Sequence, residues 1–400
     1  MALFLLTCGT MEPAVVLSKL LSCTRCGACN AGCPTYDLTR LEERGGRGRA
    51  ILAEGSLRGD FAASAPVFEA FSSCTGCGFC ERVCPVGVPV SQAVALARGA
   101  GRRTFRQRVL AWAMASRGRM SLVVSFLAAL QRVCGASLNG KIESLRIMGT
   151  SKGLPRLPFR RARWPERHAN DSSPKAAVFL GCRVRHFFPE LIPLAYELCS
   201  LARLNVVEEN GPSCSGTIAR LSGDFVAVDQ LKQQSPGVEL PTLTLCAGCR
   251  RGFRDQFARP ADDLVECLIE ALKGRRAEGP MPARVALHVP CSDRAIGSEG
   301  QQMRGLLRGL GIPFVLLAGA ECCGGAMPFS AEHRDLATSL GAKLVQESMD
   351  LQASVLVTSD AGCLLHLREG SQRVNGIPVL HGIELLASLF LPSLAPTLPC

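Results

Sequence analysis

The 400-residue sequence predicts an α+β protein, with a helical N-terminal domain followed by two tandem α/β cysteine-rich modules. Three observations predict this class. Eight cysteines fall in two dense runs before residue 97. After Lys175, short apolar runs rich in Val and Leu alternate with helical patterns. The cysteines of this second half also repeat. We expect a cluster-binding domain at 1–97, a basic helical segment and linker at 98–174, and modules at 175–280 and 281–400.

Composition indicates metal binding rather than disulfides. The chain is 47% hydrophobic and 20% charged, and it contains 21 cysteines. In a chain of this length, cysteines spaced two residues apart more often bind metal in a reducing cytosol. The N-terminus lacks a convincing secretory signal, and Met11 is an alternative start. No apolar run reaches the ~18 residues of a membrane span. We therefore expect a cytoplasmic protein, peripheral at most on the inner face of the membrane.

The two N-terminal runs are the strongest motif in the chain. Each matches C-x2-C-x2-C-x3-C-P, the pattern of bacterial ferredoxins, so a helical, ferredoxin-like domain with two [4Fe–4S] clusters is predicted. Three cysteines two residues apart wrap three corners of a cluster, and the fourth ligates the other one. The predicted ligands are Cys23, Cys26, Cys29 and Cys84 for cluster 1, and Cys74, Cys77, Cys80 and Cys33 for cluster 2. Zinc is the weaker alternative, because structural zinc sites usually combine separated pairs of ligands.

The second half contains two copies of one module. Cys182 and Cys291 are 109 residues apart, Cys214 and Cys322 are 108 apart, and each pair has a similar context. The cysteines follow predicted strand ends, where α/β sheets place ligands. Four thiolates in each copy suit an iron–sulfur cluster or zinc. The candidate ligands are Cys182, Cys214, Cys246 and Cys249 in module 1, and Cys291, Cys322, Cys323 and Cys363 in module 2.

Five other cysteines lack partners at motif spacing. We expect these to behave as small buried hydrophobic residues; they are Cys8, Cys134, Cys199, Cys267 and Cys400.

The sequence resembles a known family. The segments "CTRCGACNAGCPTY", "RGGRGRAILAEG" and "CTGCGFCERVCPVGV", followed by two cysteine-rich CCG modules, are similar to the glycolate oxidase iron–sulfur subunit over nearly the whole chain. Related proteins include the third subunit of anaerobic glycerol-3-phosphate dehydrogenase, lactate-utilisation iron–sulfur proteins and heterodisulfide reductase subunits. The resemblance implies electron transfer for a flavin-dependent dehydrogenase of a 2-hydroxy acid such as glycolate or lactate.

Each module departs from the full pattern of heterodisulfide reductases, which is C…CCG…C-x2-C with five thiolates. Module 1 has Ser215 where the second cysteine of the pair belongs, and module 2 has Asp360 where Cys246 lies in module 1. The favoured interpretation is loss of ligation at both positions, with weak oxygen ligation as the alternative. His366 is a further candidate ligand, for which a surface or core role is favoured.

Hydride chemistry on an alcohol needs a two-electron acceptor such as flavin. The sequence has no G-x-G-x-x-G after a strand, so no dinucleotide-binding fold is indicated. FAD or FMN is therefore expected on a partner flavoprotein dehydrogenase subunit. This chain would pass the electrons one at a time to an acceptor such as quinone.

The basic charge is concentrated in one segment. Residues 98–168 contain sixteen Lys and Arg against Glu143 and Glu166, a net of +14 in a chain whose total is +11. A solvated or intersubunit face is the favoured interpretation. Contact with anionic lipid through Trp112, Met114 and Phe126 is the second. Nucleic-acid binding is the least favoured, because no recognition motif accompanies the arginines.

Two further histidines lie near predicted ligands or strand ends. His288 and His381 would tune a cluster or contact quinone, although a hydrogen-bonded histidine at a strand end is favoured for each. Two other functions remain open for the chain. One is a heterodisulfide- or quinone-reductase component with catalysis at the CCG modules, and the other is a cluster-bearing sensor.

Overall fold

The computed structural model describes residues 12–61, 64–101, 108–109, 112–113, 116–129, 164–165, 176–235, 240–319 and 321–394. Cys8, Met114, Cys134 and Cys400, with most of the basic segment, lie outside the described residues.

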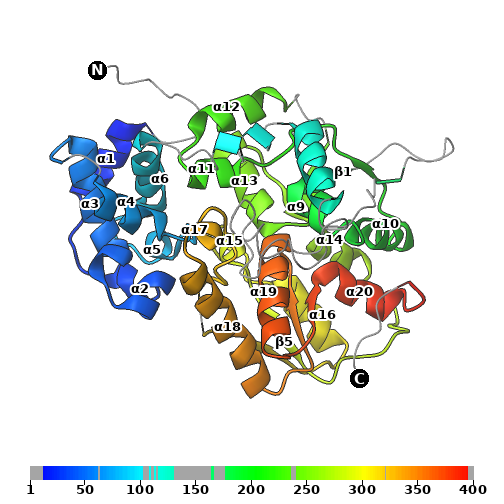
Figure 1. The fold of residues 1–400 in the computed structure, drawn as a ribbon. Coiled ribbons are helices and arrows are strands. Elements are labelled where there is room, and N and C mark those ends of the chain that lie inside the picture. The colour runs from blue at the N-terminus through cyan, green and yellow to red at the C-terminus, as the bar shows by residue number, and fades with distance from the viewer. Residues whose placement is uncertain are drawn as a thin grey trace.

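The N-terminal domain is helical. It contains α1 (Pro13–Leu21), α2 (Pro34–Thr39), α3 (Gly46–Arg58), α4 (Ala65–Ser72), α5 (Phe79–Arg82) and α6 (Val90–Ala100), with short 3₁₀ turns at Ala28–Asn30 and Glu42–Arg44. Its core is small, because mostly Ala and Val pack between α1, α3 and α6 around the fully buried Phe71. The domain forms one end of the molecule (Figure 1).

Both cysteine runs form the same kind of loop in this domain. Arg25 and Gly27 in the first run, and Gly76 and Gly78 in the second, all have positive φ between 57° and 83°. The segment between the two cysteine runs is rich in glycine, and at Gly46 the structure shows why a side chain is not tolerated. A Cβ there would lie 2.9 Å from Cys29 Cβ and 3.1 Å from Cys80 Cβ. Only glycine therefore lets α3 begin between the two loops.

Module 1 is a parallel α/β layer. Its strands are β1 (Ala176–Phe179), β2 (Val206–Glu208), β3 (Thr242–Thr244) and β4 (Asp262–Asp263), in the order β2-β1-β3-β4. The helices between and after them are α9 (Gly181–Phe187), α10 (Leu191–Leu201), α11 (Thr217–Leu221), α12 (Phe225–Gln233), α13 (Ala247–Phe257) and α14 (Leu264–Ala271).

Module 2 repeats this topology. Its strands are β5 (Val285–His288), β6 (Phe314–Leu316), β7 (Val355–Thr358) and β8 (Val379–His381), in the parallel order β6-β5-β7-β8. Its helices are α15 (Cys291–Arg294), α16 (Gln301–Gly309), α17 (Phe329–Glu332), α18 (Arg334–Asp350), α19 (Ala361–Arg373) and α20 (Gly382–Phe390). The predicted fold class and the predicted repeat are confirmed.

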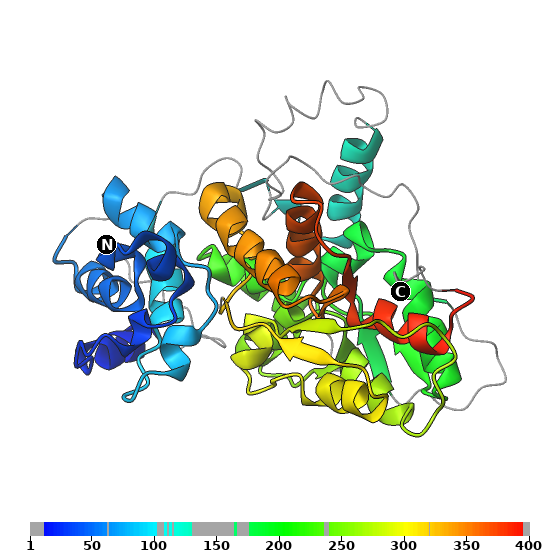
Figure 2. The same cartoon turned by 90° about the horizontal axis from the view of Figure 1, so that it is seen from below.

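The two modules share one hydrophobic core. Buried residues of both sheets form a single cluster, and α10 of module 1 packs on α20 of module 2. Cys199 is buried in this core and Cys267 packs against it, as their lack of motif spacing predicts. Figure 2 shows the strands and helices of the two modules as one continuous body, with the N-terminal helical domain to one side.

Polar contacts fasten the N-terminal domain to the modules. Arg251 on α13 donates to the Gly76 carbonyl at 2.8 Å, and the buried Arg98 on α6 donates to the Leu221 carbonyl. Arg82 forms an ion pair with Glu321 at 2.7 Å. Two of these three contacts are made to backbone carbonyls, and they hold the second cysteine loop and α6 against module 1.

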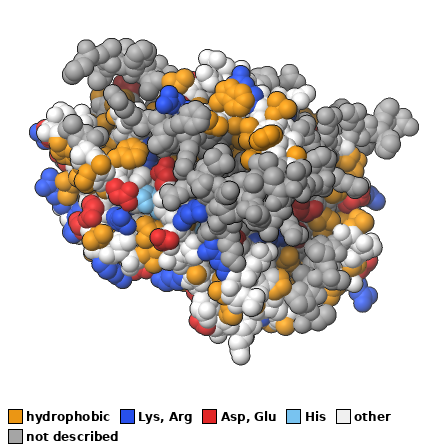
Figure 3. All heavy atoms as spheres, in the orientation of Figure 1, with side chains coloured by type: hydrophobic (Ala, Val, Ile, Leu, Met, Phe, Trp, Pro, Cys, Tyr) orange, Lys and Arg blue, Asp and Glu red, His pale blue; other side chains and the backbone are white. Residues whose placement is uncertain are grey.

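One described part of the basic segment is an amphipathic helix at residues 117–129. Met120, Val124 and Leu127 are buried, whereas Leu122 and Phe126 are each 67% exposed. No described helix combines the length and apolar character needed to cross a membrane. On the face in Figure 3, basic and acidic side chains are interspersed over the N-terminal domain rather than separated into patches of one sign.

Candidate metal centres

The structure brings the four predicted cluster 1 residues together. Cys23, Cys26, Cys29 and Cys84 line one cavity of about 390 Å³ in the N-terminal domain. The Val88 N–H donates to Cys84 Sγ at 3.3 Å. Hydrogen bonding from the Ala28 backbone lowers the pKa of Cys26, which is exposed to solvent. Backbone N–H groups directed at sulfur are typical of protein sites for iron–sulfur clusters.

The predicted cluster 2 residues form a second, more deeply buried group. Burial raises the pKa of Cys80, and the Glu81 carboxylate and the nearby Cys77, Cys74 and Cys33 raise it further. Burial also raises the pKa of Cys77 to about 12. Thiols this close cannot all ionise without a cation, and metal binding supplies that cation and releases the protons.

Buried arginines surround this second group. Arg49 is 2% exposed, and its guanidinium lies 3.7 Å from Cys33 Sγ while donating to Thr35, Ser73 and the Ala70 carbonyl. Arg98, also buried, donates to the carbonyls of Phe71, Ser72, Cys74 and Leu221.

Among the described residues, neither Arg49 nor Arg98 forms an ion pair within 4.0 Å, although the Glu332 carboxylate acts electrostatically on Arg98. Arg49 is thus the buried guanidinium of this group without an ion-pair partner among them. A buried guanidinium without a counter-charge is unfavourable. A cluster held by four thiolates carries net negative charge and would supply that counter-charge.

The third group of cysteines lies between the two modules. All eight predicted module ligands line one cavity of about 840 Å³, and they are Cys182, Cys214, Cys246, Cys249, Cys291, Cys322, Cys323 and Cys363. In each module, cysteines lie after the first strand, after the third strand, and in the loop that follows the second strand. The first and third strands are adjacent in each sheet order, so this is the switch point at which α/β sheets place their ligands.

The second and third groups are neighbours. Cys77 interacts electrostatically with both Cys291 and Cys322. Thr75 and Gly76, from the loop that carries Cys74 and Cys77, form part of the wall of the cavity. The cluster 2 loop is thus in direct contact with the site between the modules.

Within the cavity, the module 1 thiols influence one another in pairs, Cys182 with Cys214 and Cys246 with Cys249. The Cys214 thiol and the nearby Arg183 guanidinium lower the pKa of Cys182 to about 7.

The module 2 thiols also form close pairs. Cys291 Sγ lies 3.8 Å from Cys322 Sγ, and Cys323 Sγ lies 3.1 Å from Cys363 Sγ. The N–H groups of Gly324 and Gly325 each donate to a cysteine sulfur of the Cys322–Cys323 pair at 3.4 Å.

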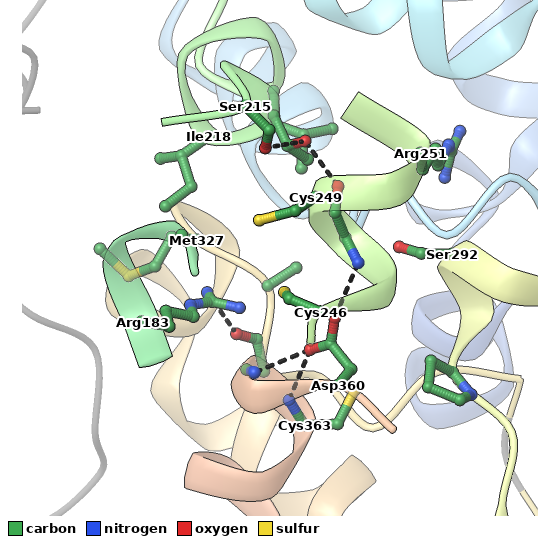
Figure 4. A pocket seen from close by; sticks show the side chains of 18 of the residues that line it. Arg183, Ser215, Ile218, Cys246, Cys249, Arg251, Ser292, Met327, Asp360 and Cys363 are labelled. Atoms are coloured by element: carbon green, nitrogen blue, oxygen red, sulfur yellow. Dashed lines mark hydrogen bonds between the residues drawn. The ribbon is translucent and has the colours of Figure 1, made fainter. Parts of the chain in front are cut away.

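Asp360 lies at the position where module 1 has a cysteine, but both of its carboxylate oxygens accept hydrogen bonds from other groups. Its Oδ1 accepts from the N–H groups of Gly362 and Cys363, at 2.7 and 3.0 Å, and therefore caps α19. Its Oδ2 accepts from the Gly248 N–H at 2.8 Å and from Cys246 Sγ at 3.1 Å (Figure 4). Burial disfavours its charge, but Arg183 and these donors outweigh burial and hold the pKa of Asp360 below its ordinary value.

Ser215 is also engaged away from the thiols. It is buried, and its Oγ lies 3.3 Å from Thr217 Oγ1, which donates to the Gly248 carbonyl (Figure 4). These contacts of Ser215 and Asp360 agree with the interpretation that ligation has been lost at both positions.

The histidines differ in their surroundings. His381 is buried, with Nδ1 accepting from Ile383 and Nε2 directed at the Leu245 carbonyl of module 1. His366 is buried and its Nε2 lies 2.8 Å from the Ala337 carbonyl. His288 alone among the described histidines belongs to a group of possible metal ligands, since a ring nitrogen lies within 4.8 Å of the sulfurs of Cys323 and Cys363.

The spacing of neither cysteine motif predicts this histidine group. Its only sequence signal is the position of His288 at the end of a strand, three residues before Cys291.

Comparisons with known proteins agree with this architecture. The family model of the 4Fe-4S dicluster domain matches residues 19–88, and the model of the CCG cysteine-rich domain matches residues 285–368. The chain therefore combines an iron–sulfur dicluster domain with a CCG-type cysteine-rich region.

Comparison of the whole chain with known proteins identifies individual relatives. The chain is 24% identical to the glycolate oxidase iron–sulfur subunit of Escherichia coli, over 92% of this chain and 94% of the relative. It is 24% identical to the probable glycolate oxidase iron–sulfur subunit of Bacillus subtilis, over 89% and 90%. It is 23% identical to one component of the fumarate reductase (CoM/CoB) of Methanothermobacter marburgensis, over 92% and 72%. The predicted resemblance is confirmed: the chain is similar to glycolate oxidase iron–sulfur subunits over about nine-tenths of its length.

Proposed function

We propose that this chain is the iron–sulfur electron-transfer subunit of a flavin-dependent 2-hydroxy-acid dehydrogenase of the glycolate or lactate type. Electrons would enter from FAD or FMN on a partner subunit and leave to an acceptor such as quinone. The similarity to two glycolate oxidase iron–sulfur subunits over about nine-tenths of the chain supports the class of complex.

The observation that carries the proposal is the order of the three cysteine groups in space. The first group includes the exposed Cys26 and offers an entry for electrons. The second group is more deeply buried than the first, with Cys33 and Cys77 buried and Cys74 and Cys80 half-buried, and its Cys77 neighbours Cys291 and Cys322 of the third group. The first and second groups meet at Gly46, where a Cβ would contact both Cys29 and Cys80. The cysteine groups thus form an uninterrupted series from the surface to the cavity.

The residues present fit two clusters in the N-terminal domain. Each predicted set supplies four thiols, and the buried Arg49 beside the second set forms no ion pair within 4.0 Å among the described residues. Bound there, [4Fe–4S] clusters would each accept and release one electron. The chain's own part is to hold the thiolates, to direct backbone N–H groups at them, and to exclude water from the second set.

Metal analysis tests this proposal. Protein purified under anaerobic conditions should contain roughly eight irons from the two N-terminal clusters, with more if the modules also hold iron. Reduction should produce the electron paramagnetic resonance (EPR) signals of two interacting [4Fe–4S] clusters. Zinc in stoichiometric amount with almost no iron would refute the electron-transfer role.

The partner is tested separately. An anaerobic pull-down should recover a flavoprotein, and adding glycolate or lactate to the recovered complex should reduce the clusters of this chain. Recovery of DNA without a flavoprotein would favour the sensor alternative. Clusters that stay oxidised with every 2-hydroxy acid tested would remove the proposed substrate class.

A second candidate is supported by the cavity. The cavity between the modules is lined by eight cysteines, which favours catalysis at the modules in the manner of a heterodisulfide or quinone reductase. Its test is a spectral change of the module centre when a disulfide or quinone is added to the reduced, isolated chain.

The exposed apolar residues of helix 117–129 support membrane contact by the complex. Leu122 and Phe126 lie one turn apart on its exposed side, and Trp112, which is 51% exposed, has Arg119 over its ring. Binding to vesicles that contain anionic lipid, lost in Phe126→Ser and Leu122→Ser, would support this contact. Equal binding by the variants would point instead to a protein partner or to solvent.

A further inference from the structure

Module 2 contains a histidine and two cysteines arranged as ligands of one metal ion. A ring nitrogen of His288 and the Sγ atoms of Cys323 and Cys363 all lie within 4.8 Å of one another, and all three residues are buried. Donors bound to one zinc ion at about 2.0–2.3 Å in tetrahedral geometry are ~3.5 Å apart. The three donors therefore need only small shifts to share one ion.

The orientation of His288 is fixed by a neighbouring strand. His288 ends β5 and pairs with Thr358 of β7, and its Nδ1 lies 3.0 Å from Thr358 Oγ1. Thr358 is fully buried, so this bond is not exchanged for water. A hydrogen bond at one ring nitrogen is the usual way in which a protein orients a metal-binding histidine, and it leaves Nε2 for the metal.

Comparison of the two modules shows that this group is particular to module 2. When Cys182 is aligned with Cys291, Phe179 takes the position of His288. Aligning Cys214 with Cys322 places Ser215 at the position of Cys323. Phe179 packs edge-on against Phe253 with ring centroids 4.8 Å apart, in an apolar cluster. Module 1 therefore lacks two of the three donors.

Asp360 does not compete for this role. All four of its hydrogen bonds are made to backbone N–H groups or to Cys246, and they occupy both carboxylate oxygens. Module 2 has thus exchanged a thiolate for a capping carboxylate at position 360, while it carries a nitrogen donor at position 288.

We propose that His288, Cys323 and Cys363 bind one metal ion of the zinc or iron type in module 2. The site has mixed nitrogen and sulfur donors, which suit these borderline metals. Three protein ligands are also the number found in zinc sites that keep one position for water or substrate. Cys323 and Cys363 line the cavity between the modules, so such a position would face it. The inference concerns module 2 alone and goes beyond the role of the two N-terminal clusters.

The test uses the full chain, purified anaerobically and analysed for zinc and iron. We expect one metal ion per chain beyond the roughly eight irons of the N-terminal clusters. His288→Gln should lose this ion, with an affinity at least tenfold lower. His366→Gln is the matched control, because His366 is equally buried in module 2 but bonds to the Ala337 carbonyl. It should retain the ion.

X-ray absorption on the wild-type protein provides a second measurement that no folding defect can obscure. If the additional ion is zinc, X-ray absorption should detect one nitrogen donor beside sulfur donors. If the additional ion is iron, pulsed EPR on protein labelled with ¹⁵N-histidine should detect a nitrogen coupled to the metal. A shell of sulfur only, an additional ion retained by His288→Gln, or no additional ion would each overturn the proposal. Unchanged EPR signals of the N-terminal clusters in the variant confirm folding. If those clusters are absent altogether while the additional ion still depends on His288, the proposed function fails and this inference stands.

Discussion

Arg49 is expected to set the reduction potential of the second cluster. Its guanidinium lies 3.7 Å from Cys33 Sγ, and the side chain is buried. A positive charge stabilises the reduced, more negative state of a cluster, so removing it should lower the potential. With an effective dielectric constant of about 20, a unit charge contributes about 4 kcal/mol at this distance and about 2 kcal/mol at ~7 Å. Those energies correspond to about 100–200 mV.

The measurement is an anaerobic redox titration of Arg49→Met followed by EPR. Arg49→Lys keeps the charge and should move the potential less than the methionine variant. Arg47→Met is the control near the first set, because Arg47 is 37% exposed and already paired with Glu42 at 2.6 Å. Its effect should be only tens of millivolts, since solvent screens an exposed charge. A second-cluster potential unchanged in Arg49→Met, or a shift confined to the first cluster, would refute the reasoning.

Three further outcomes are expected. Cys33→Ser should damage the cluster of Cys74, Cys77 and Cys80 and leave the first spectroscopically intact; loss of the first cluster alone would show that ligation is not crossed. Asp360→Ala should destabilise the protein by about 3–5 kcal/mol in thermal unfolding, because it removes a buried counter-charge and a helix cap; a midpoint equal to wild type would contradict this. Burial raises the pKa of Asp263 to about 8. The unfolded chain then releases this proton first, near pH 4, so stability should fall as pH rises from about 4 to 8. Asp263→Asn, which keeps the cap on Val265, should therefore gain stability relative to wild type at pH 8 but not at pH 4, and a pH-independent difference would argue against it.

Local patterns in the sequence predict the parts of the fold that depend on neighbouring residues. The apolar runs at "AAVF", "VALH", "FVLL" and "SVLVT" contain β1, β5, β6 and β7, and the run "LTL" overlaps β3. The repeat of the cysteines anticipates the identical strand order of the two sheets. The edge strands β2 and β4 have only three and two residues, and no apolar run in the sequence indicates them. The strand β8 is anticipated only as the strand that ends at His381.

The arrangement between elements could not be predicted. Nothing in the spacing of either module shows that their cysteines face one another across a single cavity, because this depends on how two sheets pack. The same packing explains Asp360. From the alignment it is a lost ligand, but in the folded chain it bonds to Cys246, the residue at the equivalent position of module 1, through an isolated antiparallel bridge.

The Cys246–Asp360 contact also explains why the modules can retain different sets of four cysteines. Positions 246 and 360 are equivalent by the repeat and meet between the modules, so two thiolates there would place two negative charges in contact in a buried site. With a carboxylate at one position, the pair is instead a thiol donating to an anion that Arg183 and three backbone N–H groups stabilise. On this reasoning, Asp360→Cys would not add a ligand to module 2. It would leave Arg183 without its counter-charge, and the metal content of the chain would stay the same or fall while thermal stability decreases.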